Sequence, residues 1–170
     1  AEPRRPDHAV TTGEPGELQV QSAANMVGYW NDPGKTAEVL VGNWLHTGDM
    51  GTRDADGWYW FASRRADMII RGGSNISPLE VEDVLSAHPA VAEAVVVGVP
   101  DPVLGQRVAA VVRLHPDSHA TPDEVIAFAA GRLAAYQVPE RVEIVDDIPH
   151  NATGKADRHA VLAAMDRTGA

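Results

Sequence analysis

The sequence contains no cysteine among its 170 residues. This absence excludes disulfide bonds, thiolate nucleophiles and zinc sites built on thiolates. It fits the reducing cytosol, so we expect a cytoplasmic protein. Long apolar runs are absent too, and none approaches the roughly 18 residues that a membrane-spanning helix needs. The first residues, 1–6, are not followed by an apolar stretch, so we predict neither a membrane span nor a signal peptide.

Positive charge is scarce. Lys and Arg total 14 against 24 Asp and Glu, which gives a formal net charge of −10 at pH 7. A protein that binds a phosphate backbone needs a basic face, so this balance argues against nucleic acid as a partner. Net charge says little about one pocket, and a site for a small anion stays open. The seven histidines show no spacing typical of a metal site, and we predict none.

The chain falls into two regions of different character. Residues 1–65 are rich in turns and short β-like stretches, at Glu17–Gln21, at Trp44–His46 and after the hairpin turn Asp56-Gly57. These stretches hold too few apolar strands to bury a core alone. We therefore predict that residues 1–65 form the β-rich end of a larger, incomplete N-terminal domain.

Residues 66–170 predict a small α+β domain with helices around a short mixed sheet. Ser77 and Thr121 are each followed by proline and, three residues later, by glutamate, a pattern typical of helix N-termini. Apolar, β-branched runs predict two buried strands that pair with each other. The expected strands cover 91–99, 108–114 and 142–145, and a last helix follows Lys155.

Three short stretches carry candidate chemistry. Asp49, after a glycine at an expected strand end, can offer two oxygens to a diol, or it can be a plain turn aspartate. Residues 64–75 hold three arginines beside Gly72-Gly73, where a ligand can approach the backbone closely; a tight turn with solvated arginines is the alternative. Lys155 follows a flexible Thr-Gly pair and can bind phosphate as a point charge, or it can be a surface lysine that opens a helix.

Together these stretches resemble the C-terminal portion of the adenylate-forming superfamily, which includes acyl-CoA synthetases and other AMP-dependent ligases. The resemblance covers nearly the whole chain without a large gap. It is carried by Gly13–Leu18, Gly28–Trp30, Trp44–Asp49, Asp56-Gly57, Arg64–Asn75, Ser77–Glu82, His88–Val91, Val99–Asp101 and Thr153–Lys155.

The resemblance implies a two-step reaction. ATP, with Mg2+, and a carboxylic acid first give an acyl-adenylate and pyrophosphate, and a thiol, usually that of CoA, then displaces AMP. In this family pattern Lys155 matches the adenylation lysine and Asp49 the aspartate that binds the ribose hydroxyls. Arg64 matches its partner arginine, and Phe61 matches the apolar residue beside the nucleotide.

The resemblance also implies that residues 66–170 rotate between the two steps. The hinge falls at Arg65-Ala66-Asp67, and the rotation brings the loop around Gly72 and Gly73 to line the thiol channel. The hinge position usually carries a charged residue, and Ala66 leaves no side chain there for a locking ion pair.

The family's phosphate loop and carboxylate pocket belong to its larger N-terminal part, so we expect these 170 residues alone to be inactive. The implied partners are a carboxylic acid, ATP, CoA and that N-terminal domain. Two other interpretations stay open: a non-catalytic binding module, and an adenylation domain that loads the thiol of a carrier protein. Gln137 stands where a lysine is usual, which leaves the CoA-side surface open.

Overall fold

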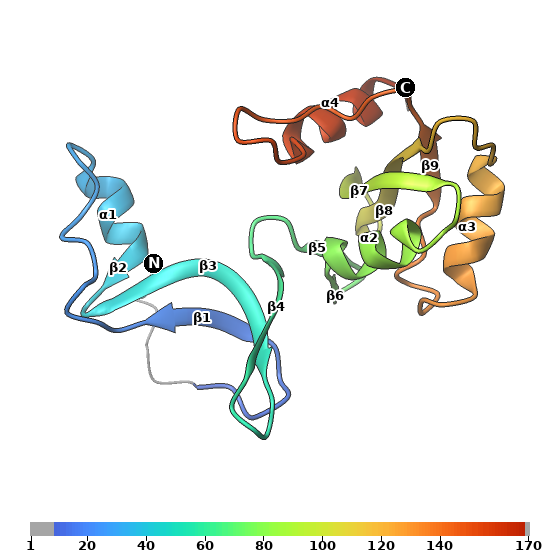
Figure 1. The fold of residues 1–170 in the computed structure, drawn as a ribbon. Coiled ribbons are helices and arrows are strands. Elements are labelled where there is room, and N and C mark those ends of the chain that lie inside the picture. Colours follow the sequence, from blue (N-terminus) through green and yellow to red (C-terminus); the bar gives the residue numbers. More distant parts are fainter. Residues whose placement is uncertain (1–8, 169–170) are drawn as a thin grey trace. The chain divides into compact units, whose positions relative to one another are not determined.

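The computed structural model describes residues 9–168, which form two compact units (Figure 1). The first unit ends at Ala66 and the second begins at Asp67. A four-stranded antiparallel sheet dominates the first unit, and its long central strand pairs with the three others. Its strands are β1 (Gly16–Val20), β2 (Leu40–Val41), β3 (Trp44–Arg53) and β4 (Tyr59–Arg64).

One helix corrects the expectation that this region is all β. Helix α1 (Pro33–Val39) begins after Asp32, whose carboxylate accepts a hydrogen bond of 2.9 Å from the backbone N–H of Lys35. Aspartate followed by proline and glycine suits a turn, but the same residues also suit a helix start. Because α1 buries no residue, the sequence lacked the apolar stripe that reveals a helix. The expected strand at Glu17 and the hairpin turn at Asp56-Gly57 are confirmed.

The second unit confirms the predicted α+β class. Its strand order is β6-β5-β8-β7, all antiparallel, and β9 joins β8 in parallel, so the sheet is mixed. The strands are β5 (Ile69–Arg71), β6 (Ser74–Ile76), β7 (Val91–Asp101), β8 (Gly105–Leu114) and β9 (Arg141–Ile144), and the helices are α2 (Pro78–Ser86), α3 (Pro122–Ala130) and α4 (Arg158–Thr168). No helix in the described part of the chain is long and apolar enough to cross a membrane.

Alternating side chains of β7 and β8 make two hydrophobic cores, one on each face of this sheet. Helices α2 and α3 cover one face and α4 covers the other (Figure 1). The first core gathers Val81, Leu85, Val96, Val108, Ala110, Val112 and Val125. The second gathers Val95, Val97, Ala109, Val111, Ile148, Val161 and Met165.

An ion pair provides hydrogen-bond partners for backbone groups at the open edge of β7. Val96 lies on that edge, where its backbone groups have no strand partner. The carboxylate of Glu82 (α2) accepts from the Val96 N–H at 2.7 Å, and the guanidinium of Arg158 (α4) donates to the Val96 carbonyl at 2.8 Å. Glu82 and Arg158 also bind each other through both carboxylate oxygens. Burial pushes the pKa of Arg158 down, but the bonds and charge of Glu82 outweigh it and raise that pKa.

We expect Glu82→Ala to destabilise the second unit by about 3 kcal/mol, because it leaves Arg158 and the Val96 N–H poorly satisfied. Urea denaturation followed by circular dichroism measures this loss. Asp147→Ala is the matched control, since Asp147 is exposed. Equal midpoints for the two variants would show that the edge contact adds no stability.

Candidate nucleotide and thiol-channel residues

Asp49 and Arg64 face each other across two strands of the first unit. They are directly opposite in the β3–β4 register, and their side chains form an ion pair with Nε–Oδ1 of 2.9 Å. Arg64 also donates from Nη1 to the Thr47 carbonyl at 3.1 Å. The sequence suggested that Asp49 ends a strand. It lies inside β3 instead, because pairing with β4 continues β3 to Arg53. The pair joins two of the predicted nucleotide residues in one place.

Phe61 lies three residues before Arg64 on β4 and is 52% exposed. The neighbouring aromatic residues Trp58, Tyr59 and Trp60 are also exposed. Trp60 donates from its indole nitrogen to Asp54 at 2.8 Å, and this bond is the largest cause of a lowered pKa for that carboxyl. The strand and the residue before it therefore expose four consecutive aromatic side chains, Trp58 to Phe61.

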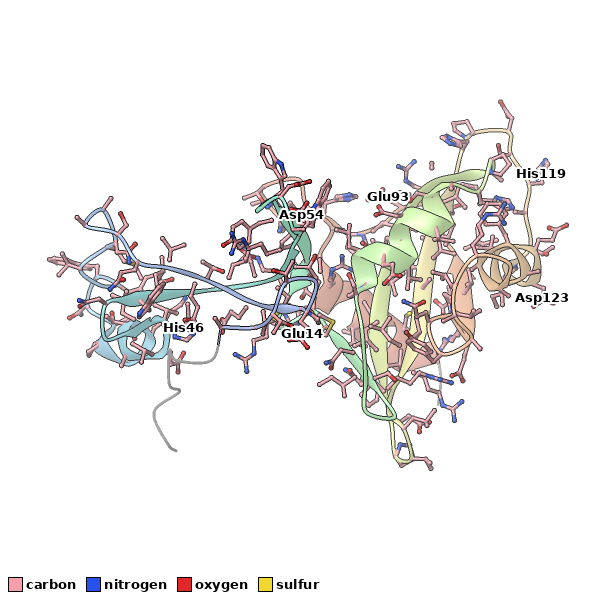
Figure 2. The ribbon with its side chains drawn as sticks, turned by 90° about the horizontal axis from the view of Figure 1, so that it is seen from below. Glu14, His46, Asp54, Glu93, His119 and Asp123 are labelled. Carbon is pink, nitrogen blue, oxygen red and sulfur yellow. The ribbon has the colours of Figure 1, made fainter. Side chains whose placement is uncertain are left out.

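Glu17 connects Gly48, the residue before Asp49, to Arg65, the first of the predicted hinge residues. Its Oε1 accepts from the backbone N–H of Gly48 at 3.2 Å, and its Oε2 pairs with Arg65 Nη1 at 3.3 Å. Arg65 also donates its backbone N–H to the Gly48 carbonyl at 2.8 Å. His46 on β3 (Figure 2) contacts the same carboxylate at 3.2 Å. Sequence reasoning missed Glu17, since its partners lie 29 to 48 positions away.

The three predicted hinge residues differ in how they are held. Arg65 is bonded within the first unit, to Glu17 and to Gly48. Asp67 is paired within the second unit, with its Oδ2 lying 3.5 Å from Arg158 Nε. Ala66, between them, has no polar side chain. Each flank is thus fixed to its own unit, and the backbone at Ala66 is the point where the two units meet along the chain.

Lys155 lies on a loop that Asn151 organises. The Asn151 side-chain oxygen accepts from the backbone N–H of Thr153 at 2.9 Å and of Lys155 at 3.1 Å. The Asn151 N–H donates to the Lys155 carbonyl at 2.8 Å, and Gly154 takes φ +78°, which favours glycine. The sequence did not single out Asn151, although asparagine is a common turn residue whose side chain bonds the backbone two residues on.

The Lys155 side chain is exposed, and among the described residues its ammonium has no hydrogen-bond or ion-pair partner. It does not open a helix, because α4 begins at Arg158 and Asp157 caps it by accepting from the Ala160 N–H at 3.1 Å. The base of the loop is fixed by His150, whose Nε2 lies 2.8 Å from Glu93 at the start of β7. This leaves a free cation on an ordered loop.

Gly72 and Gly73 form the two-residue turn of the β5–β6 hairpin, which confirms the turn expected at this place. Their φ angles are +56° and +85°, and a two-residue turn with both φ positive matches the right-handed twist of the strands. The Gly72 N–H donates to the Leu104 carbonyl at 2.8 Å. No atom lies within 4 Å of a Cβ built on Gly73, so the turn is open on that side.

The two loops of the second unit are anchored at opposite ends of one hairpin. The turn at Gly72 lies beside the start of β8, because the residue before it, Arg71, pairs with Gly105. The Lys155 loop is held through Glu93, which also binds Arg113 near the end of β8 at 3.1 Å. Eight residues of strand separate Gly105 from Arg113, or about 27 Å at roughly 3.4 Å per residue. No group of three or more metal-ligating side chains occurs among the described residues.

Gln137, which stands where the family pattern has a lysine, is buried. Its amide donates to Glu80 of α2 at 2.9 Å and accepts from the Ala134 N–H at 3.1 Å. It joins the loop after α3 to α2, a structural role that a lysine side chain could fill only in part.

Comparison with known proteins identifies the family. Residues 80–155 match the AMP-binding enzyme C-terminal domain. A long-chain-fatty-acid–CoA ligase of Bacillus subtilis is 46% identical over 149 residues, and a fatty acid–[acyl-carrier-protein] ligase, ScoC, of Streptomyces coeruleorubidus is 44% identical over 143 residues. These alignments take in 88% and 84% of this chain but only 27% and 28% of the relatives.

Solved structures agree. The o-succinylbenzoate CoA synthetase of Bacillus subtilis, solved with an acyl-adenylate intermediate, superposes with a TM-score of 0.85 at 36% identity. The match covers 92% of this chain and 32% of that enzyme. The chain belongs to the adenylate-forming family of AMP-dependent synthetases and ligases, and its residues 80–155 are an AMP-binding enzyme C-terminal domain.

Proposed function

We propose that this chain is part of an ATP-dependent carboxylic acid–CoA ligase, in which residues 1–65 complete the nucleotide site and residues 66–170 are the mobile C-terminal domain. The observation that carries the proposal is the arrangement of the second unit. A free lysine and an open glycine turn are anchored at opposite ends of one hairpin, so a rotation about Ala66 can present each in turn.

The first step brings two anions together. The carboxylate oxygen attacks the α-phosphorus of ATP, the acyl–O–P bond forms, and pyrophosphate leaves with the electron pair of the broken P–O bond. Lys155 supplies a positive charge that bridges the carboxylate and the phosphate and stabilises the charge of the transition state. Asp49 accepts from the ribose hydroxyls, and Arg64 fixes the orientation of that carboxylate. Phe61 adds an apolar surface beside the nucleotide.

The second step transfers the acyl group. The CoA sulfur attacks the acyl carbon, the thioester bond forms, and AMP leaves with the former carboxylate oxygen. Gly72 and Gly73 expose backbone without side chains, which lets a narrow thiol-bearing arm pass close to the turn. ATP and its Mg2+ would be bound mainly by the N-terminal part of the enzyme that lies outside this chain.

The chain spans about 27 to 32% of the length of its relatives, so we propose that a further domain supplies the phosphate loop and the acid pocket. The exposed aromatic strand β4 fits a surface that such a domain covers. A cytoplasmic location fits the cysteine-free sequence.

A second interpretation concerns which thiol accepts the acyl group. One relative is named as a ligase of an acyl-carrier protein, so a carrier-protein thiol is the alternative acceptor. A non-catalytic binding module is disfavoured, because a degenerate scaffold has no reason to keep Asp49, Arg64 and a free Lys155 together.

Carboxylate-dependent exchange of pyrophosphate into ATP tests the proposal. The complete enzyme is incubated with short, long and aromatic acids in turn, followed by CoA or a carrier protein. Exchange with one acid and thioester formation with CoA support the proposal. A folded enzyme that gives no exchange with any acid contradicts it, and transfer to the carrier protein alone favours the alternative.

We expect the 170-residue chain alone to give no such exchange. Its Lys155 and its Asp49–Arg64 pair are present, but the phosphate loop and acid pocket are not. The same assay on the isolated chain, with its fold checked by circular dichroism, measures this. Exchange above background would show that these residues hold a complete site.

Lys155→Ala in the complete enzyme should lower pyrophosphate exchange by about 100- to 1000-fold, because one transition-state contact is removed. Thioester formation from supplied acyl-adenylate should persist. Lys35→Ala is the matched control, since Lys35 is the other lysine of the chain and lies on α1. Equal loss of both half-reactions would mean that Lys155 has another role.

Asn151→Ala should release the turn that carries Lys155 and lower exchange by about 10- to 100-fold, since small misplacement of a catalytic group is costly. Asn151→Asp keeps the accepting oxygen, so it should retain the loop while adding an anion near the ammonium. Rates for both variants, each with its urea midpoint, separate positioning from stability. Wild-type exchange by Asn151→Ala would rule out this role.

A further inference from the structure

Four charged side chains of alternating sign lie in a row beside the Gly72–Gly73 turn. Arg71 pairs with Glu140 through Nε at 3.1 Å and Nη2 at 2.5 Å. Glu140 also binds the guanidinium of Arg107, which in turn binds Asp101. The four residues come from β5, β7, β8 and the segment before β9, so the row ties together strands that are far apart in the sequence.

Backbone hydrogen bonds close this row into a ring around the turn. Asp101 accepts with Oδ1 from the backbone N–H groups of Val103, at 2.9 Å, and Leu104, at 2.7 Å. The Leu104 carbonyl accepts from the Gly72 N–H at 2.8 Å. Gly72 follows Arg71 directly in the chain, so the series of contacts is closed. Every link is a hydrogen bond or a covalent bond between neighbours.

The ring is built on rigid backbone and stays charged at neutral pH. The N–H of Glu140 donates to the Val108 carbonyl of β8 at 2.9 Å, which holds Glu140 beside Arg107. Arg107 and the two backbone N–H groups lower the pKa of Asp101 to about 2. Partial burial pushes the pKa of Glu140 up, but Arg71 and Arg107 outweigh it and lower that pKa. Bonds between ionised groups are the stronger kind.

Apart from the ring, the turn is held by the pairing of β5 with β6, two strands of three residues each. A Cβ placed on Gly73 meets no atom within 4 Å, and one on Gly72 meets only Leu104, at 3.7 Å. Glycine also has the largest conformational freedom of any residue. A two-glycine turn that must stand at a fixed place therefore needs support from outside its own sequence.

We propose that the ring of Arg71, Glu140, Arg107 and Asp101, with Glu140 as its bridging member, positions the Gly72–Gly73 turn for the thioester-forming step. This inference rests on the proposed function of that turn. Glu140 and Arg107 are positioning residues, because they act through Arg71 and Leu104 and not on substrate. The ring lies at the opposite end of β8 from the anchor of the Lys155 loop, so its loss should affect one half-reaction only.

The test is Glu140→Gln in the complete enzyme. Glutamine keeps the shape of the side chain but removes the charge that joins two arginines. Thioester formation from supplied acyl-adenylate should fall by about 10- to 100-fold, while pyrophosphate exchange stays near the wild-type rate. Glu143→Gln is the matched control, because Glu143 lies three residues away on β9 and pairs with Arg141 outside the ring. The control should retain both half-reactions.

Three results would overturn the inference. Glu140→Gln could retain thioester formation, it could lose both half-reactions equally, or Glu143→Gln could lose as much. Arg107→Gln provides a second variant if Glu140→Gln does not fold, and it should show the same one-sided loss. The double variant should be no worse than the poorer single variant, because both break one ring.

Hydrogen exchange gives a readout that does not depend on activity. In Glu140→Gln the amides of Gly72 and Leu104 should exchange faster than in the wild type, while those of the Lys155 loop remain unchanged. Unchanged exchange at Gly72 would overturn the ring even in an active enzyme. A wild-type enzyme that forms no thioester would instead refute the proposed function and leave the ring to be judged by exchange alone.

Discussion

The contact between Glu82 and Arg158 is the constraint on which the second unit depends. It joins α2 to α4 across the edge of β7 and satisfies both outward backbone groups of Val96. Without it that edge strand would present unpaired groups, which favour association with other chains. Arg158 also reaches Asp67, the first residue of the unit. One guanidinium therefore ties the start of the unit, its sheet edge and the helix after the Lys155 loop into one body.

The rotation proposed for the second unit requires that unit to be a rigid body. Small changes at a hinge become large displacements only when the parts on either side do not deform. Here Arg65 is bonded on one side of Ala66 and Asp67 on the other, each within its own unit. The ion pair that a charged hinge residue could form is replaced by two pairs that flank the hinge. These flanking pairs leave Ala66 as the residue between them without a side-chain bond to either unit, as the proposed hinge requires.

The sequence predicted what depends on local chemistry. Ser77 and Thr121 begin helices where their capping patterns place them, and the β-branched runs form β7 and β8. What it missed depends on contacts between distant residues. Helix α1 buries nothing and so leaves no periodic signal, and the partners of Glu17 and of Glu140 lie 29 to 69 positions away. Motif spacing marked Lys155, Asp49 and Arg64, but not Asn151, whose side chain holds the Lys155 loop.

The distribution of positive charge distinguishes Lys155 from an ordinary surface lysine. The second unit is acidic, and five of its arginines are paired with carboxylates: Arg71, Arg107, Arg113, Arg141 and Arg158. Arg132 lies over the ring of Phe128 at 3.6 Å. Among the described side chains of this unit, the Lys155 ammonium is left without such a partner. An unpaired cation on this loop is available to an anion that arrives from outside the unit, which is the property that the role proposed for Lys155 requires.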